Sequence, residues 1–367
     1  MDDEARETGS LDPARERMRH GARRGRRSPH GSHDSQSGND DRGGATYAAL
    51  DLGTNNCRLL IARPTGDGFR VIDAFSRIIR LGEGVSGTGR LSPAAVSRAI
   101  DALTICRDKM RNRGVTRARL IATEACRAAD NGADFQSQVR NLVGLDLEII
   151  DRETEAALAA TGCTPLIDPQ SRGVVLFDIG GGSSELVKLG PSVPAGGGPP
   201  KPSIVGWVSL PVGVVTLAER HGGENVTPEI FERMVSEVAA HVAPFATAQG
   251  SDMAGMHMLG TSGTVTTIAG VHLDLPRYDR RRVDGCWLSE DEIGGVVDRL
   301  MRMSYSDRVA NPCIGADRAD LVLAGCAILE AIRRAFPCPR LRVADRGLRE
   351  GILVELMRAD GAWQETA

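Results

Sequence analysis

The sequence lacks the features that mark several protein classes. None of its eight cysteines forms a Cys-x-x-Cys pair, so the usual signals for zinc sites and thioredoxin-type redox sites are missing. No apolar run reaches the ~18–20 residues that a membrane-spanning helix needs. The seven histidines form no ligand pattern such as His-Glu-x-x-His. The formal net charge is only −3, so any attraction for a polyanion must come from local groups.

Unpatterned cysteines in a chain of this size favour a reduced, cytoplasmic protein. Neither a membrane partner nor a specific nucleic acid partner is expected. The 367 residues, 41% of them hydrophobic, suffice for roughly two domains. Residues 1–45 have almost no large apolar side chains and are expected to form a disordered leader. Arginines cluster between Arg15 and Arg27 and could hold a polyanion, although a solvated tail is the favoured interpretation. No signal sequence is recognisable, because the first apolar strand begins at Tyr47.

Strands and helices alternate along the rest of the chain, which predicts an α/β protein. Strands are expected at Tyr47–Asp51, Cys57–Ala62, Phe69–Ile79, Arg119–Thr123, Leu147–Ile150, Val174–Phe177, Ile204–Leu210, Met256–Thr261 and Leu341–Val343. Helices are expected from Ser92 to about Arg113, at Asp134–Val143, from Glu153 onward, and at 227–248, 289–303, Asp320–Ala335 and Gly347–Leu356. The Gly- and Pro-rich stretch Gly190–Lys201 predicts a surface loop or hairpin tip.

The strongest feature is an internal repeat at a separation of 127 residues. Ala49–Leu60 matches Leu176–Val187, and both copies run from an apolar strand through Asp-x-Gly and a small polar turn into a second apolar strand. One such turn is common in ordinary hairpins. Two in register, at domain-sized spacing, predict two related domains that face each other across one cleft.

Each turn has the chemistry of a phosphate site. Glycine lets a phosphate approach the backbone, and small polar residues leave N–H and hydroxyl groups free to donate. The expected phosphate contacts are Gly53, Thr54, Asn55 and Asn56 in the first turn and Gly180, Gly181, Gly182, Ser183 and Ser184 in the second. A carboxylate at a strand end can hold a hard cation, so Asp51 and Asp178 are the expected metal ligands.

A third loop of similar chemistry follows the expected strand Met256–Thr261. Its candidate phosphate contacts are Gly260, Thr261, Gly263 and Thr264, where a helix N-terminus would favour an anion. Taken alone, this loop is better explained as an ordinary strand-to-helix turn with hydroxyl caps.

Five segments together resemble the Ppx/GppA family of exopolyphosphatases and guanosine pentaphosphate phosphohydrolases: Asp51–Arg58, Asp178–Leu186, Pro211–Gly213, Gly260–Thr264 and Gly347–Gly351. The resemblance covers about residues 46–357. It implies two ribonuclease-H-like domains of the actin, Hsp70 and sugar-kinase superfamily, with a cleft between them. Residues 46–170 would form the first actin-like domain and 171–346 the second, with the helix at 347–357 packing back on the first and 358–367 as a tail. The chain resembles the short form of the family.

The resemblance also assigns roles to residues outside the glycine turns. It points to Glu124, in Ala-Thr-Glu-Ala-Cys-Arg, as the catalytic base, whereas the residues alone favour a glutamate that complements a helix dipole. Of Glu153 and Glu155 we prefer Glu153 as a second catalytic acidic residue. Arg58 would contact phosphate, and Glu185, its counterpart in the repeat, would contact metal or water. Arg127 could contact phosphate, or it could pair with Glu124 or another carboxylate.

The function expected from this resemblance is exopolyphosphatase: removal of terminal phosphate from inorganic polyphosphate, with Mg²⁺ or another divalent cation and Glu124 activating water. Hydrolysis of guanosine pentaphosphate (pppGpp) is the alternative, with the same chemistry and a different leaving group. A sugar kinase or a nucleotide-binding sensor of the same fold is a more distant alternative. Family members are often dimers, so a homodimer is also expected.

Overall fold

The first lobe is built on a five-stranded sheet in the order β3-β2-β1-β4-β5. A computed structural model describes residues 44–250 and 252–363, so the expected leader lies almost entirely outside the described residues, as do the last four residues. In this sheet β1 pairs antiparallel with β2 and parallel with β4. The strands are β1 (Tyr47–Leu52), β2 (Asn56–Pro64), β3 (Phe69–Ile78), β4 (Arg117–Ala122) and β5 (Glu148–Ile149).

The second lobe repeats this arrangement. Its six-stranded sheet has the order β10-β11-β9-β6-β7-β8, in which β6 pairs antiparallel with β7 and parallel with β9. The run β8-β7-β6-β9-β11 therefore corresponds to β3-β2-β1-β4-β5. The strands are β6 (Gly173–Ile179), β7 (Ser184–Val193), β8 (Lys201–Leu210), β9 (Met256–Thr261), β10 (Trp287–Ser289) and β11 (Arg340–Ala344). The sequence repeat is thus a repeat of topology.

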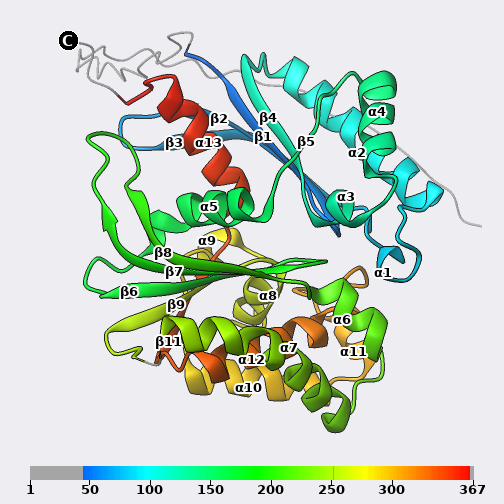
Figure 1. Ribbon diagram of the computed structural model, residues 1–367, viewed down its shortest axis with the longest axis vertical. Coiled ribbons are helices and arrows are strands. Elements are labelled where there is room, and N and C mark those ends of the chain that lie inside the picture. Colours follow the sequence, from blue (N-terminus) through cyan, green and yellow to red (C-terminus); the bar gives the residue numbers. More distant parts are fainter. Residues whose placement is uncertain (1–43, 251, 364–367) are drawn as a thin grey trace, which may run out of the picture. The chain divides into compact units, whose positions relative to one another are not determined.

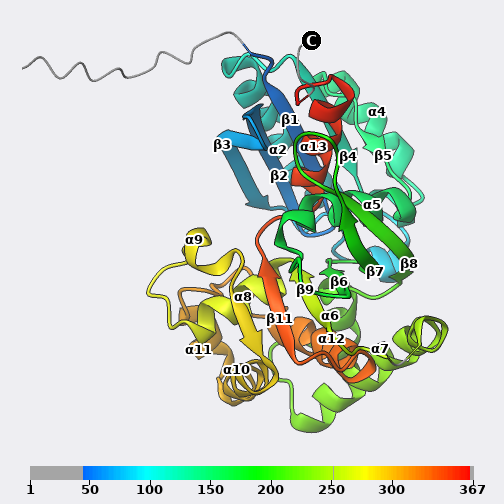
Figure 2. The same ribbon diagram turned by 90° about the vertical axis from the view of Figure 1, so that its left-hand side faces the viewer.

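Helices cover both faces of each sheet (Figures 1 and 2). Those of the first lobe are α1 (Val85–Thr88), α2 (Pro93–Asn112), α3 (Glu124–Ala128), α4 (Gly132–Val143) and α5 (Arg152–Cys163), and a 3-10 turn follows at Thr164–Leu166. Those of the second lobe are α6 (Val214–His221), α7 (Pro228–Gln249), α8 (Gly263–His272), α9 (Arg280–Val283), α10 (Glu290–Arg302), α11 (Tyr305–Ala310) and α12 (Val322–Ala335). In the described residues, no helix is both long enough and apolar enough to cross a membrane.

Local signals explain where several of these elements begin and end. Ser92 caps α2 by accepting a hydrogen bond from the Ala95 N–H, and Pro93 is its first residue, as predicted. Gly114, just beyond α2, has a positive φ of 61°. Residues 194–200 form the tip of the β7–β8 hairpin, inside the predicted stretch Gly190–Lys201, while Gly190–Val193 still belong to β7. The short elements α1, α6, α9, α11 and β10 were not predicted.

The last helix, α13 (Leu348–Ala359), packs on the first lobe although it follows the second in the chain. In Figure 1 it lies beside β1 and β2, on the face opposite α2 and α4. Leu348, Ile352 and Leu353 share a core cluster there with Tyr47 and Ala49 of β1. The other face of β1 (Ala48, Leu50 and Leu52) packs in a different cluster with α2 and α4.

Helix α5 connects the cores of the two lobes. Leu158 belongs to the cluster that β1 forms with α13, whereas Ala156, Ala160 and Cys163 belong to a cluster with β6 and β9. Because side chains alternate along a strand, Asp51 points to the same face of β1 as Ala49, toward α5 and α13. Asp178 likewise points to the same face of β6 as Leu176, which packs in the cluster with α5. The alternation of each strand therefore turns the two aspartates toward one shared layer of helices.

Candidate active site

A cavity of about 580 Å³ lies where the two repeat turns meet. It is large enough for a small-molecule ligand, since such pockets usually measure roughly 300–1,000 Å³. Most of the residues predicted from the sequence line it: Asp51, Gly53, Thr54, Asn55, Asn56, Arg58, Glu124, Asp178, Gly180, Gly181, Gly182, Ser183, Glu185, Thr261, Gly263 and Thr264. The two copies of the repeat and the third loop therefore surround one space.

The two repeat turns touch each other directly. A Cβ atom added to Gly181 would lie 2.9 Å from the Thr54 Cβ, and one added to Gly182 would lie 2.9 Å from the Thr54 Oγ1 and 3.1 Å from the Glu124 Cγ. Only glycine permits this approach without displacing the first turn or Glu124. Gly213 presses on the second turn from behind, since its added Cβ would lie 2.4 Å from the Gly181 carbonyl carbon.

Four carboxylates at the cavity have raised pKa values. Burial raises the pKa of Asp178 to about 6 and that of Asp51 in the same direction, although Arg58 opposes both shifts. Burial and the charge of Asp178 raise the pKa of Glu185 to about 7, although Ser183 and Ser209 donate hydrogen bonds to its Oε1 at 2.8 and 2.9 Å. Burial and the charge of Glu185 raise the pKa of Glu155 well above its ordinary value. Ionising these four carboxylates together is costly unless a cation enters the cavity.

Asp51 and Asp178 are the donors best suited to such a cation, because neither carboxylate has a hydrogen-bond or ion-pair partner in the part of the chain that the structure describes. In those residues no group of three or more His, Cys, Asp or Glu side chains is close enough to hold a metal ion by itself. This donor set fits Mg²⁺, which typically uses one or two carboxylates and completes its shell with water and substrate phosphate. It does not fit a zinc or calcium cage made of protein ligands alone.

Glu124 is held from two sides at the start of α3. The Arg127 Nε and Nη2 donate to its Oε2 at 3.0 and 2.8 Å, and the Arg152 Nη2 donates to its Oε1 at 2.9 Å. The Arg127 Nη2 also donates to the Glu155 Oε2 at 2.9 Å. Of the two roles considered for Arg127, pairing with Glu124 is therefore the one observed, and it orients the carboxylate beside Gly182.

Three arginines carry positive charge to the cavity without a protein partner. Arg58, Arg318 and Arg349 line it, and among residues 44–250 and 252–363 none of their guanidinium groups has a hydrogen bond or ion pair. Burial and the nearby Arg58 lower the pKa of Arg318, and burial does the same for Arg349. Partly buried, unpaired guanidinium groups have a strong preference for an anion. The cavity can thus bind several phosphate groups beside its carboxylates.

Two further arginines in the lining are already neutralised. The Arg280 Nη2 donates to the Glu350 Oε1 at 3.0 Å, and the Arg346 Nε donates to the Asp284 Oδ2 at 3.1 Å. Arg318 was missed by the sequence analysis: it lies in an irregular turn between α11 and α12, and no pattern in the sequence marks it.

The third loop has a strained backbone where it meets the cavity. Ser262 has a φ of 115°, a value that residues other than glycine rarely adopt. Its hydroxyl accepts a hydrogen bond from the Thr264 N–H at 3.3 Å at the start of α8. Thr261 is fixed by a hydrogen bond from its Oγ1 to the Arg346 carbonyl oxygen at 2.7 Å. These contacts hold the N-terminus of α8 toward the cavity.

A model of the Ppx/GppA phosphatase family matches residues 60–360 of the chain. The chain belongs to this family. "Exopolyphosphatase 2" of Mycobacterium tuberculosis is 28% identical over 330 residues, which cover 84% of this chain and 98% of that one. A solved Ppx/GppA protein of Aquifex aeolicus is 28% identical with a TM-score of 0.71, covering 86% of this chain and 98% of its own. A solved protein described as exopolyphosphatase-like is 29% identical with a TM-score of 0.77 and the same coverage.

Membership confirms the two-domain, actin-like fold that the family resemblance implied and identifies the chain as a phosphatase. In this Ppx/GppA protein, however, three of the predicted site residues lie outside the cavity lining: Glu153, Ser184 and Gly260. Glu153 and Glu155 are two positions apart in α5, and this separation rotates their side chains about 200° around the helix axis. Glu153 is therefore exposed, whereas Glu155 lines the cavity. The preference for Glu153 over Glu155 is therefore not supported by the geometry.

Ser184 and Gly260 have structural roles instead. Ser184 begins β7 and alternates with Ser183, so its buried hydroxyl donates to the Val212 carbonyl oxygen at 2.8 Å. Gly260 lies within β9 against Phe177, where an added Cβ would approach the ring to 2.5 Å. Ser184 thus contacts the segment just before Gly213, and Gly260 packs against the strand that precedes the second repeat turn.

Proposed function

We propose that the protein is an exopolyphosphatase that uses Mg²⁺ or another divalent cation to hydrolyse the terminal phosphoanhydride bond of inorganic polyphosphate. The observation that carries the proposal is the contact of the two repeat turns around one cavity. Its lining includes three arginines and two aspartates whose side chains have no hydrogen bond or ion pair among the described residues. Phosphate oxygens suit the arginines and the backbone N–H groups of the turns. The name of the mycobacterial relative agrees with this substrate class.

In this proposal Glu124 orients and deprotonates the attacking water. Its Oε1 accepts one hydrogen bond from Arg152 and keeps acceptor capacity for the water, since an ionised carboxylate offers about four lone-pair directions. The water oxygen bonds to the terminal phosphorus, the bond to the bridging oxygen breaks, and the water proton passes to Glu124. The products are orthophosphate and a polyphosphate shortened by one residue.

Charge on the transferred phosphoryl group has to be balanced during this step. Arg58, Arg318 and Arg349 are the side chains proposed to bind its oxygens and those of the following phosphates. Asp51 and Asp178 would hold the divalent cation, which supplies electrostatic stabilisation of the phosphoryl oxygens. Glu155 shares Arg127 with Glu124 and is proposed to fix the position of the base rather than to act as a second base.

The proposal is tested by measuring phosphate release from long-chain polyphosphate and from pppGpp side by side, with Mg²⁺ and with excess chelator. Release from polyphosphate that requires the added cation is the expected result. Preferential release from pppGpp would replace the substrate assignment but keep the site. Full activity after chelation would contradict the roles of Asp51 and Asp178.

A further inference from the structure

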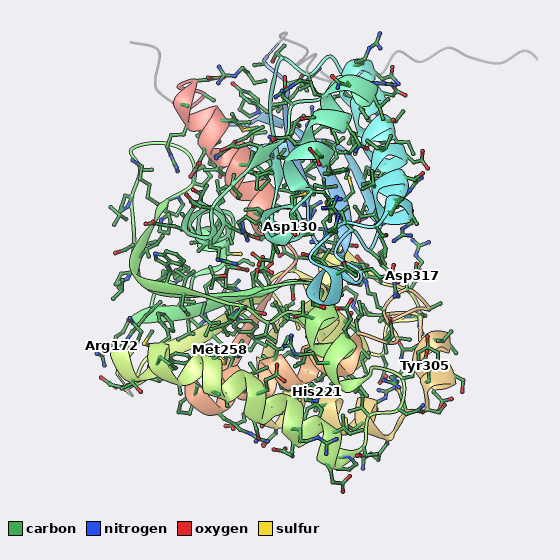
Figure 3. All side chains as sticks on the ribbon, turned by 45° about the vertical axis from the view of Figure 1, so that its right-hand side comes forward. Asp130, Arg172, His221, Met258, Tyr305 and Asp317 are labelled. Carbon is green, nitrogen blue, oxygen red and sulfur yellow. The ribbon has the colours of Figure 1, made fainter. Side chains whose placement is uncertain are left out.

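A pair of contacts joins the two lobes at the edge of the cavity. Arg80, between β3 and α1, donates from its Nη1 and Nη2 to the Asp320 Oδ2 and Oδ1 at 3.0 and 3.1 Å. Its Nη2 also donates to the backbone oxygen of Asp317, which Figure 3 labels, at 3.2 Å. Asp320 precedes α12 of the second lobe. We call the bidentate Arg80–Asp320 ion pair the clasp.

On the first lobe, the clasp is anchored to a phosphate turn. The backbone N–H of Arg80 donates to the Asn55 carbonyl oxygen at 3.0 Å, and the neighbouring Gly82 N–H donates to the Thr54 oxygen at 2.9 Å. Arg80 adopts a left-handed conformation with φ 46°, which is unfavourable for a side chain larger than glycine's. The Arg98 guanidinium holds it there by donating to the Arg80 carbonyl oxygen at 3.2 Å.

On the second lobe, the clasp is anchored to the turn that carries Arg318. The N–H groups of Leu321 and Val322 both donate to the Arg318 carbonyl oxygen, at 2.9 and 3.0 Å, so Asp320 and Arg318 belong to one tight turn. The Arg318 Nη1 in turn lies 3.6 Å from the Cβ position of Gly263 in the third loop. Fixing Asp320 therefore fixes the backbone from which Arg318 reaches the cavity.

The clasp is close to the cavity and partly shielded from water. The side chains of Arg80 and Asp320 are 33% and 24% exposed. A second cavity, of about 290 Å³, is lined by both of them and shares Asn55 and Leu321 with the main one. A bidentate arginine–carboxylate pair in such surroundings is stronger and more directional than an ordinary surface ion pair.

We propose that Arg80 and Asp320 are positioning residues which clasp the two lobes together so that Arg318 binds phosphate groups held by the third loop. The proposal rests on the proposed function for its substrate class, an inorganic phosphate chain. Arg80 and Asp320 act through Arg318, which is the residue that contacts the phosphate. A second contact supports the same closure: Glu219 of α6 accepts hydrogen bonds from the Gly84 N–H at 2.9 Å and from the Ser86 hydroxyl.

The test measures binding of inorganic tripolyphosphate to the full-length protein by calorimetry, which needs no turnover. Arg318→Ala is expected to raise the Kd roughly 10- to 100-fold, the range for a lost hydrogen bond to a charged group. Asp320→Ala is expected to raise the Kd roughly fivefold or more. The Kd of the double variant should lie within about twofold of that of Arg318→Ala alone. Arg80→Lys, which keeps the charge but loses the bidentate geometry, should fall between wild type and Asp320→Ala.

The matched control is Glu232→Ala, which removes a bidentate arginine–glutamate pair of the second lobe away from the cavity and should leave the Kd unchanged. The proposed role of the clasp would be overturned if the separate effects of Asp320→Ala and Arg318→Ala on the Kd multiply in the double variant. It would also be overturned by an unchanged Kd in Asp320→Ala, or by a wild type that does not bind tripolyphosphate. A wild type that binds tripolyphosphate with the expected non-additive pattern but releases no phosphate from polyphosphate would refute the proposed function and leave the clasp standing.

Discussion

Replacing Asp178 by asparagine should stabilise the metal-free protein at neutral pH while impairing its function. Asp178 is half-buried, has no hydrogen-bond or ion-pair partner among the described residues, and has a pKa raised from 3.8 to about 6. At 1.36 kcal/mol per pKa unit this shift corresponds to at most about 3 kcal/mol. The folded state binds the proton more tightly than the unfolded state. Stability is therefore lost as pH rises from 3.8 toward 6, and the full loss persists above that range.

The assay is urea unfolding of wild type and Asp178→Asn in excess chelator at pH 7.5 and pH 4. We expect the variant to have the higher free energy of unfolding at pH 7.5, by up to about 3 kcal/mol, and the two proteins to converge at pH 4. Asp73→Asn is the control of opposite sign, because hydrogen bonds from Lys109 and Arg113 lower the pKa of Asp73 to about 2. It should destabilise the protein at pH 7.5. A lower stability of Asp178→Asn at both pH values would refute the reasoning.

Three further predictions concern turnover. Glu124→Gln should lower the rate of phosphate release roughly 10²- to 10⁴-fold, as expected for loss of a positioned base, and leave tripolyphosphate binding within about threefold of wild type; an equal loss of binding would contradict the assignment. Glu155→Gln should lower the rate at least about tenfold because it removes the negative charge of the ion pair with Arg127, whereas Glu153→Gln should match wild type in the same assay, and the reverse order would contradict the geometry. Gly182→Ala should reduce activity and lower the melting temperature, because its Cβ would approach the Glu124 Cγ to 3.1 Å; an active variant of normal stability would show that the two turns are not in close contact.

The repeat was the part of this structure most accessible from sequence. Aspartate and glycine at strand ends have strong local requirements, so the turns at Asp51 and Asp178 and the strands that flank them could be predicted. Local sequence patterns do not show which side of a helix packs against the other lobe. Glu153 and Glu155 satisfy the same N-terminal helix preference, and only the packing of α5 between two sheets distinguishes them.

Residues that depend on long-range contacts were correspondingly harder to predict. Arg318 becomes part of the site through a turn fixed by Arg80, 238 positions earlier in the chain, and no spacing rule connects the two. Ser184 and Gly260 were predicted as phosphate contacts because their residue types suit that task. Strand alternation turns the Ser184 side chain away from the cavity, and Gly260 lies within β9, outside the cavity lining. The expected homodimer and the role of the arginine-rich leader stay predictions.

The position of α13 has a consequence for synthesis on the ribosome. One face of β1 and β2 is covered by Leu348, Ile352 and Leu353, which emerge some 300 positions after those strands. Until then only Ile150 and Leu158, among the buried residues of this cluster outside the strands, are available to cover that face, so part of its apolar surface stays exposed. Premature termination after β11 should therefore yield an aggregation-prone product without phosphatase activity, since the first lobe is completed by a helix that follows the second lobe in the chain.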